Sequence, residues 1–175
     1  KNVLTADKAV ASLFLAIFSV GIAIGSVAIN RLLGGHVSAR YAPASVVGMG
    51  VCVIGFHIVC RLWTPAPTGE MLMLIDFIEH PMAIPLGLSL LGVATFGGMF
   101  VVPLYAFLTT TVEKCEAART VAANNIVNSG AMVVGSVIAI GLSVAGLPVV
   151  DQLLLVAVMT VPCAWLAWRL HCACD

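Results

Sequence analysis

Residues 9–30 of the chain read AVASLFLAIFSVGIAIGSVAIN and contain no charged side chain. An α-helix rises about 1.5 Å per residue, so about 20 apolar residues cross the hydrocarbon layer of a bilayer, which is roughly 30 Å thick. The stretch is long enough to do this, and Arg31 follows it directly. It predicts a transmembrane helix, because open strands leave backbone groups without hydrogen-bond partners in lipid.

Four further stretches have the same apolar character, and a tight turn at Gly146-Leu147-Pro148 makes the last two antiparallel neighbours. Together they predict an all-α membrane protein, a bundle of about five transmembrane helices that occupies the whole chain, 1–175, as one domain. The predicted helices are 9–30, 43–61, 82–108, 121–146 and 150–168.

The composition points to the same class of protein. Of the 175 residues, 61% are hydrophobic and only 9% are charged, whereas soluble domains carry about 25% charged residues. Most of the surface is therefore expected to face membrane lipids. The formal net charge is zero and there is no basic tract, which argues against a nucleic-acid partner.

The loop charges predict a sidedness. Arg31, Arg40 and Arg169 fall at one end of the predicted bundle, and the acidic segment 62–81 falls at the other. Excess Lys and Arg marks the cytoplasmic side, so the loops 31–41 and 109–120 and the C-terminus are expected in the cytoplasm. In the outer segment, Trp63 is placed as an interfacial aromatic, and 69–80 forms either a short surface helix or a loop.

The cysteines at the end of the chain allow two interpretations. Cys172 and Cys174 lie beside His171, as in a metal or lipidation site, but no second ligand pair stands at metal-finger spacing. We predict free thiols, and neither a metal site nor a cofactor. The predicted spans also lack paired acids, paired histidines and a serine–histidine set, so we expect a protein that is not an enzyme.

The end of the first helix carries a candidate loop motif: Gly25, Asn30, Arg31, Gly35 and Arg40. Glycine permits a tight turn after the helix. The arginines can hydrogen-bond the last carbonyls of a helix or pair with an acid. Gly21 and Gly25 are small residues four apart, a spacing that lets two transmembrane helices approach closely.

The third predicted helix contains Gly97, Gly98 and Pro103. Proline cannot donate to the helix hydrogen-bond ladder and is expected to kink the helix. Two interpretations are open. The kink beside the glycine pair is a hinge that flexes in a transporter, or it is static and serves close packing.

The fourth predicted helix carries the most polar intramembrane cluster. Asn124 and Asn128 are four apart and share a face, with Asn125 on the adjacent stripe. Amides in hydrocarbon are unfavourable unless paired, so this face points into the bundle or into a watery path. The amides either bind a polar headgroup or hydrogen-bond neighbouring helices. Arg119 either meets a phosphate at the same mouth or anchors the helix at the interface.

The loop motif resembles the cytoplasmic loop signature of the major facilitator superfamily, Gly-x-x-x-Asp-Arg-x-Gly-Arg-Arg. Asn30 stands at the acidic position of that signature, and Arg40 is what remains of its basic tail. The segments FVVPLYAFL at 100–108, AANNIVN at 122–128 and SVGIAIGS at 19–26 are similar to the bacterial lysophospholipid transporter branch of this superfamily.

The resemblance implies a function and an architecture. The five helices correspond to the eighth to twelfth of a twelve-helix transporter, of which this chain is a C-terminal portion, with the N-terminal half as its partner. The implied cargo is a lysophospholipid, such as lysophosphatidylethanolamine, moved across the bacterial inner membrane. Some relatives of this branch are fused to a phospholipid acyltransferase. Two alternatives stay open, a drug or small-molecule efflux facilitator and a non-transporting membrane module of such an acyltransferase.

Overall fold

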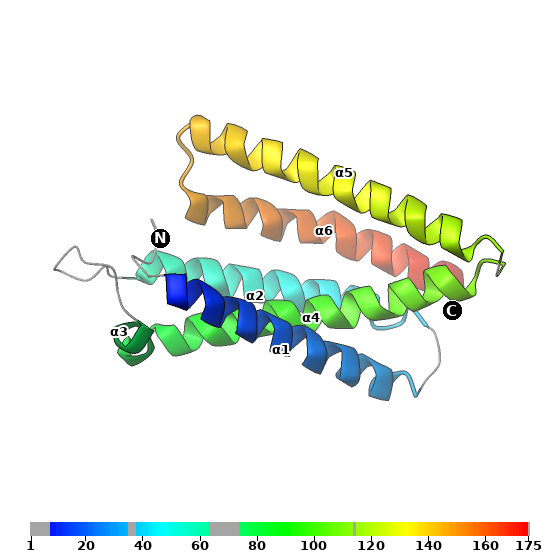
Figure 1. Ribbon diagram of the computed structural model, residues 1–175, viewed down its shortest axis with the longest axis horizontal. Coiled ribbons are helices and arrows are strands. Elements are labelled where there is room, and N and C mark those ends of the chain that lie inside the picture. The colour runs from blue at the N-terminus through cyan, green and yellow to red at the C-terminus, as the bar shows by residue number, and fades with distance from the viewer. Residues whose placement is uncertain (1–7, 35–37, 64–73, 114, 175) are drawn as a thin grey trace.

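The computed structural model describes residues 8–34, 38–63, 74–113 and 115–174, and every regular element in this part of the chain is a helix. Five of the helices are long and apolar enough to cross a membrane, which confirms the predicted all-α bundle (Figure 1). The sixth, α3, is a short helix within the segment 62–81. The helices are α1 (Lys8–Leu32), α2 (Ala42–Leu62), α3 (Leu74–Glu79), α4 (Ala83–Thr110), α5 (Ala117–Val144) and α6 (Val149–Cys174).

The helices differ from the predicted ranges mainly at their polar ends. α5 begins at Ala117 rather than at 121, and α6 continues to Cys174 rather than ending at 168. Hydropathy marks the apolar part of a helix, whereas the backbone ladder continues through charged residues. Arg169 is an example of a charged residue inside α6. Its guanidinium lies over the ring of Trp165, 5.1 Å from the ring centroid.

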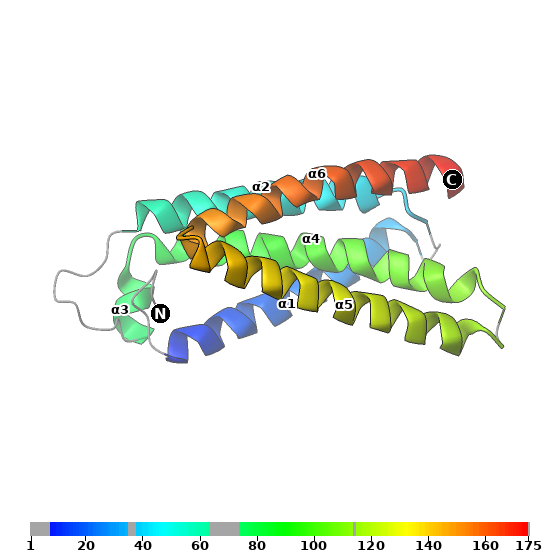
Figure 2. The ribbon, with the colours of Figure 1, turned by 90° about the horizontal axis from the view of Figure 1, so that it is seen from above.

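The five long helices run antiparallel in chain order (Figures 1 and 2). The C-terminal ends of α1, α4 and α6 lie together at one end of the bundle, which we call the C-terminal end. α3 and the turn between α5 and α6 lie at the other, the α3 end. This is the alternation that the loop charges led us to expect. Which end faces the cytoplasm stays a prediction.

Glycines set the closest helix contact, where α1 crosses α4. A Cβ on Gly21 would lie 2.6 Å from Cβ of Ala94, and one on Gly25 would overlap the carbonyl oxygen of Thr95. From the other side, a Cβ on Gly98 would lie 2.8 Å from the carbonyl oxygen of Ile22. At Gly25 and Gly98 the backbones therefore touch without side chains between them, as expected from the small residues four apart in α1.

α2 lies between α4 and α6 and packs against both. Its Gly50 leaves room for Thr160 of α6, and Cys52 fills the space beside Gly92 of α4. Towards the α3 end, His57 Nδ1 donates to the carbonyl oxygen of Val150 at 2.8 Å. A carbonyl can only accept, so this ring nitrogen carries the proton. His57, the one histidine in the predicted span of α2, therefore hydrogen-bonds to α6.

An aromatic cluster closes the α3 end. Trp63 is only 6% exposed. Its ring stacks on Phe77 of α3 at 5.4 Å and on His80 at 4.1 Å, and Phe77 meets Phe14 of α1 edge-on at 5.7 Å. α3 therefore covers Trp63, and the position of Trp63 at the membrane interface stays a prediction. Of the two interpretations of 69–80, the helix is present over Leu74–Glu79.

α5 stands apart from the rest of the bundle. It contains no buried residue and contacts α4 and α6 alone among the described helices. At its end, Leu147 N–H donates to Leu142 O and Gly146 N–H donates to Ser143 O. With Gly146 at φ +88°, this is a Schellman motif. The predicted tight turn between the last two helices is confirmed.

Candidate functional site

A cleft of about 650 Å³ opens between α4, α5 and α6 near the C-terminal end of the bundle. Its wall is mostly apolar and aromatic, and α5 contributes two amides. Leu170 comes from the part of α6 beyond the predicted end of that helix. The lining residues are Phe100, Val101, Leu104, Tyr105, Phe107, Leu108, Asn124, Asn128 and Leu170.

The sequence of α5 explains why its amides face this cleft. Asn124 and Asn128 are one helical turn apart and lie on one face. The opposite side of α5 carries large aliphatic residues that nothing in the described chain covers, among them Ile126 and Val133, which are 73% and 63% exposed. Aliphatic side chains suit contact with lipid, and amides do not. Asn124 is half-buried and Asn128 is exposed, and both line the cleft; a binding role for this amide face stays a prediction.

Asn125 lies outside the cleft but beside its rim. The hydroxyl of Tyr105 donates to Oδ1 of Asn125 over 3.4 Å, a long and therefore weak hydrogen bond between α4 and α5. Both interpretations of the amide cluster thus have a counterpart in the structure. Asn124 and Asn128 are free to meet a ligand in the cleft, while Asn125 contacts a neighbouring helix.

Arg119 does not join the amides. It stands five positions before Asn124, which is about 140° around a helix. Its side chain is exposed and absent from the cleft lining. The expectation of a phosphate contact at the same mouth has no geometric support in this arrangement. A position at the end of an apolar helix fits the alternative, an arginine that anchors α5 at the membrane surface.

The structure does not bring the residues of the loop motif together at one site. Gly25 is buried in the contact with Thr95, whereas Asn30, Arg31 and Arg40 are exposed. The guanidinium of Arg40 lies 5.9 Å from the ring centroid of Tyr41. The turn after α1 uses Gly34 at φ +57°. Gly35 lies outside the described residues.

The candidate hinge residues have different surroundings. Gly98 is buried against the backbone of Ile22, while a Cβ on Gly97 would meet no other atom within 4 Å. Pro103 is buried inside α4, which continues as a helix to Thr110. Gly98 therefore has a packing role at the α1–α4 crossing. The flexing of α4 at these positions stays a prediction.

The groups that line the cleft can bind a polar ligand. Amides donate and accept hydrogen bonds, and Tyr105 adds a hydroxyl, but none of these lining groups is charged. Within the described ranges, no three or more His, Cys, Asp or Glu side chains stand close enough together to hold a metal ion. Cys172 is an exposed free thiol on α6. The side chain of Cys174 lies outside the described residues.

Sequence reasoning missed the apolar wall and the role of Tyr105. The wall combines α4 and α6, helices far apart in the chain, and their packing cannot be read from hydropathy alone. Tyr105 carried a usable signal, because a hydroxyl in an apolar helix needs a partner. Comparisons of the chain with protein-family models, curated proteins and solved structures gave no match. The relation to the major facilitator superfamily therefore stays a prediction from the motifs quoted above.

Proposed function

We propose that this chain forms part of a secondary transporter of the major facilitator type that moves a lysophospholipid across the bacterial inner membrane. The observation that carries the proposal is the cleft between α4, α5 and α6, which joins two amides to an apolar wall. A ligand that fits it has a small polar head and a hydrocarbon tail.

The polar groups of the cleft suit a zwitterionic head. Each asparagine amide offers two N–H donors and a carbonyl acceptor. The N–H groups can donate to a phosphate oxygen, and the carbonyl can accept from an ammonium group. A head without net charge needs no charged partner in a low-dielectric site, and none of the lining residues is charged. Phosphoethanolamine has this chemistry.

The apolar part of the cleft suits a single tail. At about 650 Å³, the cleft lies within the usual 300–1,000 Å³ of small-molecule sites. Phe100, Leu104 and Leu170 provide hydrocarbon surface from α4 and α6. α5, which carries the amides, packs on the bundle without burying any residue. A loosely held wall supports the opening and closing that alternating access requires.

Uptake of labelled lysophosphatidylethanolamine into spheroplasts that express the protein tests the proposal. Asn124→Ala and Asn128→Ala together are expected to lower the initial uptake rate by about tenfold or more, the effect of about 1.4 kcal/mol. Ser136→Ala is the matched control. Its hydroxyl bonds only the carbonyl of Met132 in its own helix, at 2.8 Å, and uptake is expected to be unchanged.

Each other outcome bears on a specific alternative. Uptake no higher than in spheroplasts without the protein would contradict lysophospholipid transport. Export of an amphipathic dye in its place would favour the efflux facilitator. Lysophospholipid uptake that is unaffected by both asparagine substitutions would return Asn124 and Asn128 to a packing role. Absence of all transport, with an acyltransferase co-purified, would favour the non-transporting module.

A further inference from the structure

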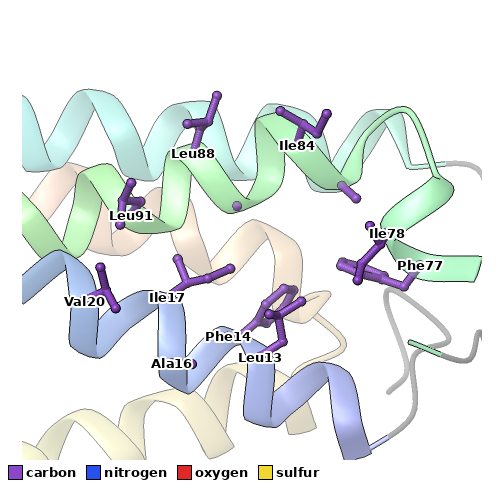
Figure 3. Close-up of a pocket in the computed structure, with 12 residues that line it drawn as sticks. Leu13, Phe14, Ala16, Ile17, Val20, Phe77, Ile78, Ile84, Leu88 and Leu91 are labelled. Carbon is purple, nitrogen blue, oxygen red and sulfur yellow. The ribbon is translucent and has the colours of Figure 1, made fainter. Parts of the chain in front are cut away.

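A second hollow of about 450 Å³ lies at the other end of the bundle, between α1, α3 and α4 (Figure 3). Every side chain that lines it is a hydrocarbon. We infer that this groove binds one acyl chain of a phospholipid from the leaflet of the bilayer at the α3 end. The inference does not depend on the transport proposal, because the groove shares no residue with the cleft that holds the amides.

The α1–α4 crossing creates the groove. The two helices touch at Gly21, where a Cβ would lie 2.9 Å from the carbonyl oxygen of Leu91. From there they separate towards the α3 end (Figure 2). At Gly87, nearer that end, a Cβ would meet only Cδ1 of Ile17, at 3.7 Å. Because Gly87 has no side chain, the space between the diverging helices stays open.

Both ends of the groove are closed. Leu91 and Val20 lie at the inner end, next to the contact at Gly21. At the outer end, Phe77 and Ile78 of α3 project between α1 and α4 (Figure 3). Phe77 is held there by its contacts with Phe14 and Trp63. The groove is open sideways, where Ile84 and Leu88 are 70% and 62% exposed.

The length of the groove favours an acyl chain over another transmembrane helix. On α1 the lining runs from Leu13 to Val20, a rise of about 10 Å. One leaflet contributes roughly 15 Å of hydrocarbon, and a transmembrane helix must cross both leaflets, roughly 30 Å. A helix can pass over this groove but cannot fill it, because α3 and the Gly21 contact block both ends. An acyl chain ends within its own leaflet.

The surroundings of the groove supply the ligand. α1 and α4 are both apolar enough to span a membrane, which puts the groove between them at the depth of the lipid acyl chains. An apolar hollow that stays empty loses dispersion contacts with its lining. α3, which contributes Phe77 and Ile78 to the outer end of the groove, also carries exposed Asp76 and Glu79, whose carboxylates favour a headgroup that carries an ammonium group.

Retention of lipid by the purified protein tests the inference. The protein is extracted in mild detergent from membranes that contain phosphatidylethanolamine, and bound phospholipid is measured by native mass spectrometry. We expect one retained phospholipid per chain. Gly87→Leu puts a side chain into the groove and is expected to lower this occupancy by about tenfold, a change of about 1.4 kcal/mol. Gly141→Leu is the matched control, because a Cβ there meets no atom within 4 Å and lies outside the groove.

A second measurement covers the case in which the leucine variant fails to fold. A phospholipid with a photoreactive group in mid-chain is added to membranes holding the unaltered protein, and the labelled residues are identified. Labels concentrated at Ile17, Gly87 and Leu91 support the inference. Labels spread evenly over the lipid-facing surface, including Val133 of α5, would overturn it. An absence of labels from the groove would also overturn it, because a protein segment or a second copy would then occupy the groove. In the retention experiment, equal lipid occupancy in the unaltered protein, Gly87→Leu and Gly141→Leu would overturn it as well.

Discussion

Gly25 of α1 lies so close to Thr95 of α4 that a Cβ at residue 25 would overlap the threonine carbonyl oxygen. This contact fixes where α1 and α4 cross. On one side of it the helices separate to form the groove, and on the other lies the turn that carries the loop motif.

Gly25→Ala is expected to destabilise the bundle. The added methyl group meets backbone rather than a flexible side chain, so the helices must move apart, and overpacking of this kind typically costs 1–3 kcal/mol. The measurement is the midpoint of thermal unfolding in detergent micelles. Gly141→Ala is the control, since it fills open space and favours helix by up to about 1 kcal/mol. Equal midpoints for the two variants would contradict the close crossing.

Phe77→Ala is expected to free the aromatic cluster at the α3 end. Phe77 is only 2% exposed, and removal of a buried phenylalanine typically costs about 3–5 kcal/mol. Because Trp63 stacks on Phe77, its fluorescence is expected to shift to longer wavelength in a background where Trp165 and Trp168 are phenylalanine. Ile75→Ala, at a residue 71% exposed, is expected to leave the emission unchanged. An unshifted spectrum in Phe77→Ala would show that α3 does not cover Trp63.

Asn125→Ala is expected to affect transport less than the substitution of Asn124 and Asn128. Asn125 lies outside the cleft, and its hydrogen bond to Tyr105 is 3.4 Å long. Its loss is expected to cost no more than about 0.5 kcal/mol, roughly a twofold change in the uptake rate. Tyr105→Phe removes the other partner of the bond and tests whether the pair matters. A loss with Asn125→Ala as large as with Asn128→Ala would show that the cleft alone does not bind the substrate.

Cys115 offers a test of sidedness. It is exposed in the segment between α4 and α5, at the end predicted to be cytoplasmic. A membrane-impermeant maleimide is expected to label Cys115 in inside-out vesicles and not in intact spheroplasts, with the site identified by mass spectrometry. Cys60 is buried and is expected to stay unlabelled in both preparations. Labelling of Cys115 in intact spheroplasts would reverse the orientation.

The sequence predicted the long helices because each needs only an uninterrupted apolar stretch of sufficient length. The ends were less accurate, since α6 continues through Arg169 and His171 to Cys174. The small residues of α1 predicted a tightly packed face. They did not predict its partner, because Thr95 and Gly98 lie far along the chain and are brought in by tertiary packing.

The candidate site could also be predicted only in part, because spacing shows which residues share a helix face but not what that face contacts. The four-residue spacing of Asn124 and Asn128 indicated a shared face, and both residues line the same cleft. The spacing could not show that Arg119 lies on another side of α5, because the start of that helix was placed after it. The apolar groove left no signal at all, since its lining residues look like any others that face lipid.

The weak packing of α5 has a mechanical consequence. The segments 111–116 and 145–148 tether it at both ends, and the second of these is locked in a Schellman motif. Because α5 contacts only α4 and α6 among the described helices and buries no residue, an outward swing about the turn at Gly146 is expected to break few contacts. The displacement in such a swing increases with distance from Gly146, and Asn124 and Asn128 lie in the far half of the helix.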